Sequence, residues 1–175
     1  MTVYYPTATN VQGMTKIQGV ASIADMEAPD LSSEISAVGS VDLSCYLDDW
    51  NVEIQQNEGS APARLCTTVQ LPVPGNTQFS AVPITYVYDP QAASSTNDNK
   101  AKALLSEGSI VYFVVRKGLD ADSVDWAAGQ YVEVYKVRCG RQNFTKTGTD
   151  EFAEYRVTQK LYPLNEPTEG VQIVA

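Results

Sequence analysis

The chain has 175 residues, a formal net charge of −9 at pH 7 and no histidine. This length is typical of one domain with a sizeable core, and no apolar run reaches the roughly eighteen residues of a membrane-spanning helix, so we expect no membrane partner. The acidic balance argues against tight binding of nucleic acid, because affinity for phosphates depends mainly on Lys and Arg. Without histidine, Ser-His and Cys-His nucleophile pairs are excluded within the chain, and we predict no enzymatic activity, catalytic residue, metal site or cofactor.

Residues 14–40 form a long acidic and polar stretch with scattered apolar side chains and weak periodicity. Ala28-Pro29 blocks a continuous helix there. Such a segment either wraps around the surface of its own domain or forms an arm that docks on a neighbouring subunit, and both interpretations stay open. Because its apolar residues are sparse, we expect the segment to become ordered only on contact.

Alternation of apolar and polar residues predicts half-buried strands over 41–48, 65–71 and 82–88. We expect turns at Pro74-Gly75 and Asp89-Pro90, which follow the second and third of these strands. Between the first two strands, residues 50–63 read as a polar hairpin or long loop with Val52 and Ile54 as its apolar anchors. Loops of that length in compact domains are usually functional or disordered.

A short amphipathic helix is predicted over about residues 98–107, with Asn97 or Asp98 as its N-cap and Gly108 as its stop. Ala101, Leu104 and Leu105 fall on one face of this helix. Residues 110–115 then run apolar without alternation, as in a strand that is covered on both faces. We therefore expect a central strand with the helix packed outside it.

The C-terminal third predicts a loop over 117–129 and three further strands, at 131–139, 153–161 and 171–174. The alternation slips near Tyr135, which suggests a bulge. Asp120, Asp122 and Asp125 begin like a calcium loop, but the glycine and the terminal glutamate of that loop are missing, so a polar turn is favoured. The cysteines, at 45, 66 and 139, lack CxxC spacing, and we expect buried free thiols.

Together these patterns predict a mainly β fold, a β-sandwich or barrel with one flanking α-helix. We expect a single domain over residues 1–175, in which 1–40 form an N-terminal arm and 41–175 form the sandwich with its long hairpin loop. Charge is unevenly placed along it. Residues 1–62 carry one base and nine acids, a net charge of −8, whereas residues 63–175 carry eleven bases and twelve acids, a net charge of −1.

Several segments resemble a known family. Residues 15–47, with Ala28-Pro29, Ser33-Glu34-Ile35 and the run from Val41 to Tyr46, resemble the N-terminal portion of the major tail tube proteins of long-tailed, siphovirus-type phages that infect actinobacteria. The run from Lys102 to Gly108 into Val111 to Arg116, and later Tyr155 to Leu161, is similar to the helix-strand unit and the penultimate strand of that family. The resemblance spans most of the chain.

The resemblance implies a structural virion protein that is assembled in the host cytoplasm and located in the virion tail. Its subunits would close into hexameric rings, and the rings would stack into the tube that conducts viral DNA into the host without binding it specifically. The implied partners are other copies of the chain, the tape measure protein and the tail terminator protein. No cofactor is implied.

Ring closure and stacking are both head-to-tail contacts, so each requires two different complementary surfaces. Candidate contact residues come from the N-terminal stretch, the long loop and the basic strands: Ile17, Val20, Ile23, Leu31, Trp50, Val52, Ile54, Arg138, Arg156 and Lys160. The acidic first third of one subunit would face the basic strands of a neighbour and steer association. Asp42 and Asp48 are candidates for the tube lumen, where negative walls would let DNA slide.

Other interpretations stay open. A tail terminator or a baseplate ring protein would share the fold. An immunoglobulin-like binding or adhesion module would also be β-rich and acidic, but it would behave as a stable monomer with a ligand-specific loop end. A small enzyme with a carboxylate pair would need a deep polar pocket. Self-polymerisation separates these classes.

Overall fold

The computed structural model describes residues 12–62, 65–66, 69–147, 151 and 153–175. The fold is mainly β, and the named strands pair in antiparallel fashion. One sheet contains β1 (Thr15–Val20), β2 (Val41–Asp42), β5 (Val82–Val87), β6 (Ile110–Lys117), β7 (Tyr131–Cys139), β8 (Asn143–Lys146), β9 (Tyr155–Pro163) and β10 (Thr168–Gln172). Its order is β2-β1-β6-β7-β9-β5, with β10 paired to β7 and β8 paired to β9.

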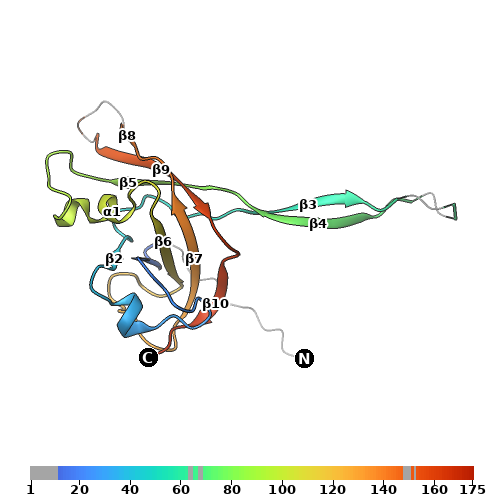
Figure 1. Ribbon diagram of the computed structural model, residues 1–175, viewed down its shortest axis with the longest axis horizontal. Helices are drawn as coiled ribbons and strands as arrows, with labels where there is room; N and C mark the ends of the chain where they lie inside the picture. Colours follow the sequence, from blue (N-terminus) through green and yellow to red (C-terminus); the bar gives the residue numbers. More distant parts are fainter. Residues whose placement is uncertain (1–11, 63–64, 67–68, 148–150, 152) are drawn as a thin grey trace.

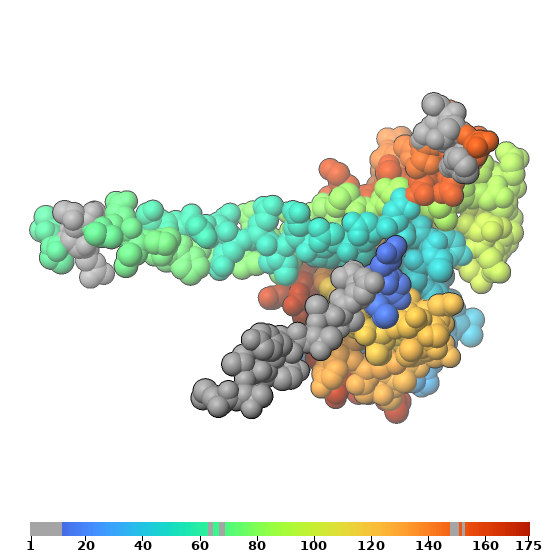
Figure 2. Space-filling view, turned by 180° about the vertical axis from the view of Figure 1, so that it is seen from behind, coloured from blue at the N-terminus to red at the C-terminus, as the bar shows by residue number. Residues whose placement is uncertain are grey.

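The remaining two strands, β3 (Ile54–Ser60) and β4 (Pro72–Phe79), pair only with each other. They form a hairpin that runs away from the body of the molecule (Figure 1). Seen from behind, the hairpin is a narrow rod with no other described segment packed along its outer part (Figure 2). The molecule therefore consists of a compact body and one long projection.

Strand β6 lies inside the sheet, hydrogen-bonded to β1 on one side and β7 on the other. Its side chains enter two cores, one on each face of the sheet. Val111, Phe113 and Val115 belong to the first core, whereas Val114 belongs to the second. The run at 110–115 is therefore apolar without alternation because both faces of β6 are covered, as we expected.

The first core lies under the short helix. A 3₁₀ turn, η2 (Asn97–Asn99), leads into α1 (Lys100–Leu104), and Ala101 and Leu105 are fully buried in this core. Gly19 of β1 makes room for the helix, because a Cβ at this position would approach Leu104 Cδ2 at 2.5 Å. The inner face of the predicted helix is therefore confirmed.

The helix itself is shorter than the predicted span of about 98–107. Neither Asn97 nor Asp98 caps it; the N-cap positions are Thr96 for η2 and Asn99 for α1, and neither side chain makes a capping hydrogen bond. Gly108 lies beyond the helix in a tight turn, where its positive φ of 82° suits glycine and its N–H donates to Cys139 O. A five-residue helix gains its stability from packing rather than from its own hydrogen bonds.

The second core lies on the opposite face and uses the N-terminal stretch. Val20, Ile23 and Ile35 are buried there together with Val114, Val132, Val134 and Ile173. A short π-helix, η1 (Leu31–Ile35), begins at Asp30, whose carboxylate accepts hydrogen bonds from Ser33 N and from the hydroxyls of Ser32 and Ser33. β1 therefore lies in the sheet, and Val20, Ile23 and Ile35 fix the N-terminal stretch in the second core.

We expected a β-sandwich or barrel; the described strands form antiparallel sheets and no closed barrel. The two ends of the sheet, β2 and β5, are instead joined by the segment that follows β2. Leu47 bridges Tyr86, Asp48 N donates to Thr85 O, and Val87 N donates to Tyr46 O. This irregular segment covers the edge of β5 without completing a regular ladder.

That segment also corrects the predicted strand over 41–48. Only Val41–Asp42 are β-strand; a turn follows, in which the N–H groups of Tyr46 and Leu47 donate to Leu43 O. Leu43 still points into the first core and is fully buried. Cys45 is consequently exposed, as is Cys66, and only Cys139 is the buried thiol that we expected of all three.

Three further predictions were wrong. The turn expected at Pro74-Gly75 lies inside β4, and the described residues of the predicted strand 65–71 are not in a strand. No bulge occurs at Tyr135, because β6 and β7 stay in register from Ile110 opposite Arg138 to Val115 opposite Glu133. The alternation slips there because both faces of β7 are buried. Within the part of the chain that the structure describes, no helix is long and apolar enough to cross a membrane.

Candidate assembly surfaces

The hairpin is the most exposed part of the described structure. Every residue of β3 is exposed, and so is every residue of β4 except the partly buried Phe79. The two strands pair from Ile54 opposite Phe79 to Ser60 opposite Pro72, with one register shift between Gln56 and Glu58. A two-stranded ribbon without a covered face is marginally stable in water at best. The hairpin therefore has the properties of an element that another surface covers.

The described residues in the outer part of the hairpin include four exposed apolar side chains. Leu65 is fully exposed, and Val69, Leu71 and Val73 expose 64%, 65% and 45% of their surface. Among the described residues from 54 to 79, Glu58 carries the only charge. Several large apolar side chains exposed on one projecting element are typical of a contact site in soluble proteins.

The inner end of the hairpin is anchored in the body by Trp50. Its ring stacks on Phe113 with centroids 4.9 Å apart and meets Tyr135 edge-on at 5.4 Å. Val52 packs against the same core, whereas Ile54 is 48% exposed at the start of β3. Of the two expected anchors, Val52 thus contacts the body and Ile54 already belongs to the projection.

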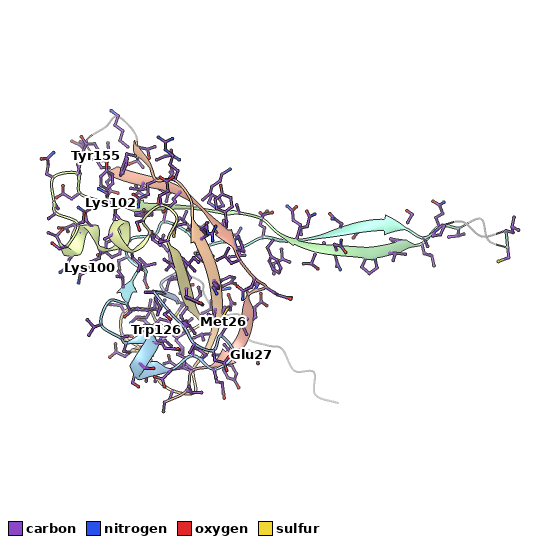
Figure 3. The ribbon with its side chains drawn as sticks, viewed as in Figure 1. Met26, Glu27, Lys100, Lys102, Trp126 and Tyr155 are labelled. Carbon is purple, nitrogen blue, oxygen red and sulfur yellow. The ribbon has the colours of Figure 1, made fainter. Side chains whose placement is uncertain are left out.

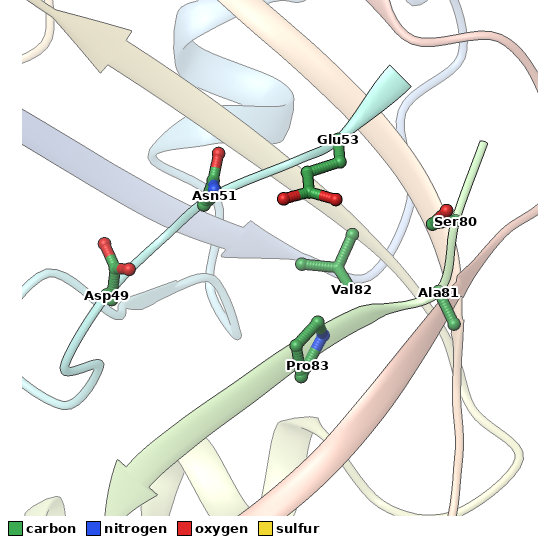
Figure 4. A pocket seen from close by; sticks show the side chains of 7 residues that line it. All are labelled: Asp49, Asn51, Glu53, Ser80, Ala81, Val82 and Pro83. Carbon is green, nitrogen blue, oxygen red and sulfur yellow. The ribbon is translucent and has the colours of Figure 1, made fainter. Parts of the chain in front are cut away.

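A hollow of about 270 Å³ lies where the two legs of the hairpin leave the body (Figure 4). Asp49, Asn51 and Glu53 line it from one leg, and residues 80–83 line it from the other. Among the described residues, no group of three or more His, Cys, Asp or Glu residues is arranged so that it could hold a metal ion. This hollow lies between the two legs of the hairpin.

A comparison with protein families matches residues 2–175 to the family described as phage tail tube protein. The chain belongs to this family. Tail tube proteins are structural components of the virion, are generally non-enzymatic and self-assemble into a tube. The resemblance to tail tube proteins is thereby confirmed at the level of the family, and a comparison with curated proteins found no match.

Within this tail tube protein, the two candidate lumen carboxylates are both exposed and both engaged. Asp42 lies 4.0 Å from Lys16 Nζ and accepts a hydrogen bond from Ser44 N at 2.9 Å. Asp48 forms an ion pair with Arg156, which also contacts Glu154 at 2.7 Å. Hydrogen bonding to Asp48 raises the pKa of the Arg156 guanidinium. These pairs reduce the negative charge that either carboxylate presents to solvent.

The candidate contact residues fall into three groups. Ile17, Val20 and Ile23 are at most 5% exposed inside the subunit's own cores, and Leu31 and Trp50 pack partly buried against them. Arg156 is paired within the subunit. Arg138 and Lys160 are exposed, and neither takes part in an ion pair among the described residues. The side chains free to meet a neighbour are therefore Ile54, Arg138 and Lys160.

One exposed surface was not predicted. Tyr88, Phe144 and Tyr155 form an aromatic group. The centroid of the Tyr88 ring lies 5.3 Å from that of Phe144 and 6.3 Å from that of Tyr155, and Lys102 Nζ lies 4.9 Å from the same Tyr88 centroid. Phe144 and Tyr155 are more than half exposed. Lys102 and Tyr155 lie together at the end of the sheet near α1 (Figure 3). Tyr155 lies on the same face of β9 as the buried Val157, but it is exposed because it is the first residue of the strand.

Proposed function

We propose that this tail tube protein polymerises as stacked hexameric rings that form the conduit for viral DNA in the tail of a long-tailed phage of actinobacteria. Assembly takes place in the host cytoplasm, with the tape measure and tail terminator proteins as further partners. Membership of the tail tube family supports self-assembly and a place in the virion. Hexamers, DNA passage and the host are the proposed refinements.

The observation that carries the proposal is the hairpin, which exposes both faces and carries the exposed side chains of Leu65, Val69, Leu71 and Val73. Ring closure and ring stacking are head-to-tail contacts, so one surface of each subunit must meet a different surface of the next. A projection of two strands reaches beyond the body that bears it (Figure 1). We assign the hairpin to the contact with a neighbouring subunit, where its apolar side chains become buried.

The acidic composition supports passage of DNA rather than binding. A net charge of −9 repels phosphate, and a wall without clustered free cations lets a strand slide. We propose that Asp42 and Asp48 face the lumen. Their pairing with Lys16 and Arg156 would make that wall weakly negative or neutral.

The test replaces residues 54–79 with a short Gly-Ser turn and compares this variant with the full-length protein by electron microscopy and sedimentation. We expect long hollow tubes from the full-length protein, and only monomers or isolated rings from the variant. Circular dichroism checks that the body of the variant remains folded. Long tubes from the variant would contradict the role of the hairpin; isolated rings from the full-length protein would favour a terminator, and stable monomers a binding module.

The reactivity of the chain's own cysteine thiols gives a second measure of whether assembly covers the hairpin. Cys66 is exposed near the tip of the hairpin, and Cys45 is exposed on the body. In a Cys45→Ser background, a maleimide reagent will label Cys66 rapidly in the monomer and slowly in the tube, because assembly covers the tip. Equal labelling rates in the two states would show that the tip stays outside every contact.

A further inference from the structure

The register of the hairpin determines which backbone N–H and C=O groups of its outer part point toward the partner strand and which point away from it. Ala61 N donates to Leu71 O at 3.0 Å, and the register continues with Ser60 opposite Pro72, Gly59 opposite Val73 and Glu58 opposite Pro74. In an antiparallel pair, the N–H and C=O groups of one residue point toward the partner strand, and those of the next residue point away. The groups of Gly59 and Val73 therefore point inward, like those of Ala61 and Leu71.

The groups of Glu58 and Ser60 on β3 point outward, as do those of Pro72 and Pro74 on β4. Proline has no N–H, so the outer edge of β4 lacks both donors along this stretch. The hairpin loses no bond of its own, because a residue at these positions would have directed its N–H away from β3. The outer edge of β3 keeps the N–H and C=O of Glu58 and of Ser60. The two edges of one hairpin thus differ in their capacity to pair.

Three observations indicate that the open edge is used. A two-stranded ribbon exposed on both faces becomes stable when a third strand joins it. Exposed strand edges usually carry charges that prevent unwanted pairing, but Glu58 is the only charge in the described part of the hairpin. The family assembles from copies of one chain, which makes a second copy the available partner.

We propose that a second copy of the chain adds a strand to the outer edge of β3 at Glu58–Ser60, and that Pro72 and Pro74 close the outer edge of β4 to the same contact. The added strand is a segment other than β3, because pairing of β3 with β3 would use both open edges and end in a closed dimer. Each hairpin then has one accepting edge, which gives the contact a direction suited to continued growth. This inference rests on the proposed self-assembly.

The first test is hydrogen exchange on the wild-type protein, which needs no variant. The amides of Glu58 and Ser60 point outward and will exchange rapidly in the monomer, whereas the Ala61 amide is already bonded to Leu71 O. In the tube, the amides of Glu58 and Ser60 will become protected at least about tenfold. Exchange at these two amides that stays as fast in tubes as in monomers would overturn the proposal.

The second test compares Ser60→Pro with the matched control Ser60→Ala. Both remove the hydroxyl, but only proline removes the outward N–H, and the bond from Ala61 to Leu71 remains in each. We expect the critical concentration for tube assembly to rise about tenfold or more for Ser60→Pro, because the loss of one backbone hydrogen bond lowers an association constant by about tenfold. Ser60→Ala will assemble like the wild type. Glu58→Pro, at the other outward position, repeats the test if Ser60→Pro disturbs the hairpin.

The reciprocal variant Pro72→Ser returns a donor to the outer edge of β4. We expect it to keep tube assembly and to add lateral aggregation of tubes or hairpins, visible by electron microscopy and light scattering. Normal assembly of Ser60→Pro together with loss of assembly on hairpin deletion would overturn the edge assignment and leave the proposed function standing. Failure of the full-length protein to form tubes would overturn the proposed function itself.

Discussion

Arg116 is the largest fully buried side chain among the residues that the structure describes, and backbone oxygens rather than carboxylates hold its charge. Its guanidinium donates to the carbonyl oxygens of Asp120, Val124 and Asp125 at 2.8–2.9 Å. It also reaches Gln130 Oε1 at 3.1 Å and lies 5.1 Å from the ring of Trp126. Burial lowers the pKa of Arg116, but an arginine stays charged at any ordinary pH.

The loop that resembled the start of a calcium site is therefore folded around an internal cation. The carboxylate of Asp120 turns back to accept hydrogen bonds from the N–H groups of Asp122 and Ser123. These bonds, with that to Ser123 the strongest, lower the pKa of Asp120. A polar turn, favoured on the missing glycine and glutamate, is what the structure shows.

Replacing Arg116 tests this role. Arg116→Met leaves several acceptors of the loop without a donor, and we expect it to lower the free energy of unfolding by about 3 kcal/mol. Amide exchange across residues 118–130 will accelerate at the same time. The neighbouring Lys117→Met removes an exposed ion pair with Glu133 and will cost about 1 kcal/mol or less. Chemical denaturation of the two variants decides the matter, and equal stability would contradict the structural role of Arg116.

Among the elements, the hairpin contains one position at which only glycine fits. At the register shift, Asn57 faces both Gly75 and Asn76, which is the arrangement of a β-bulge. A Cβ at Gly75 would lie 2.8 Å from Asn57 O, a backbone atom that cannot move independently. The Pro74-Gly75 pair, which suggested a turn, thus lies inside β4, where Gly75 allows the backbone of β3 at Asn57 to come close.

Gly75→Ala will distort the bulge and misdirect the outer third of the hairpin. We expect a rise of about tenfold in the critical concentration for assembly, because overpacking costs roughly 1–3 kcal/mol. The thermal unfolding of the body will stay unchanged, since the hairpin packs on the body only at its root. Gly59→Ala is the matched control: its Cβ would meet Val73 O at an ordinary 4.0 Å. Sedimentation measures both, and equal assembly of the two variants would count against the prediction.

For the whole molecule, charge is the property that extends beyond single contacts. Nearly all of the net charge lies in residues 1–62, whereas Arg138 and Lys160 remain exposed on the strands β7 and β9. Arg156, which we had grouped with them, forms ion pairs with Asp48 and Glu154 of its own subunit. The acidic and basic surfaces that we propose to meet between two subunits are thus smaller than the composition suggests, and we expect them to act on the rate of association more than on affinity.

Assembly kinetics at different salt concentrations test this arrangement. We expect the rate of tube growth to fall on the order of tenfold from low to high salt, because screening weakens the attraction between acidic and basic surfaces. The double variant Arg138→Gln/Lys160→Gln will grow slowly at low salt and respond less to added salt. Lys100→Gln, exposed on α1, serves as the control. A rate independent of salt would exclude steering, and a rate that rises with salt would show that net repulsion dominates.

Much of the body follows from local patterns. The strands β5, β6, β7 and β9 and the inner face of α1 were predicted from periodicity, because the side-chain repeat records which faces are buried. The strand expected over 41–48 was wrong because a turn also brings Leu43 inward. The hairpin was only half recognised, since its strands have no buried face and therefore no alternation to detect.

The sequence by itself determined the family, the central strand and the absence of histidine chemistry, since these depend on residue identity and local order. Only the tertiary structure decided that Ile17, Val20 and Ile23 fill the subunit's own cores and that the hairpin projects uncovered. An apolar residue in a sequence indicates burial without indicating the surface that buries it. That choice between the chain's own core and a neighbour depends on contacts between residues far apart in the sequence.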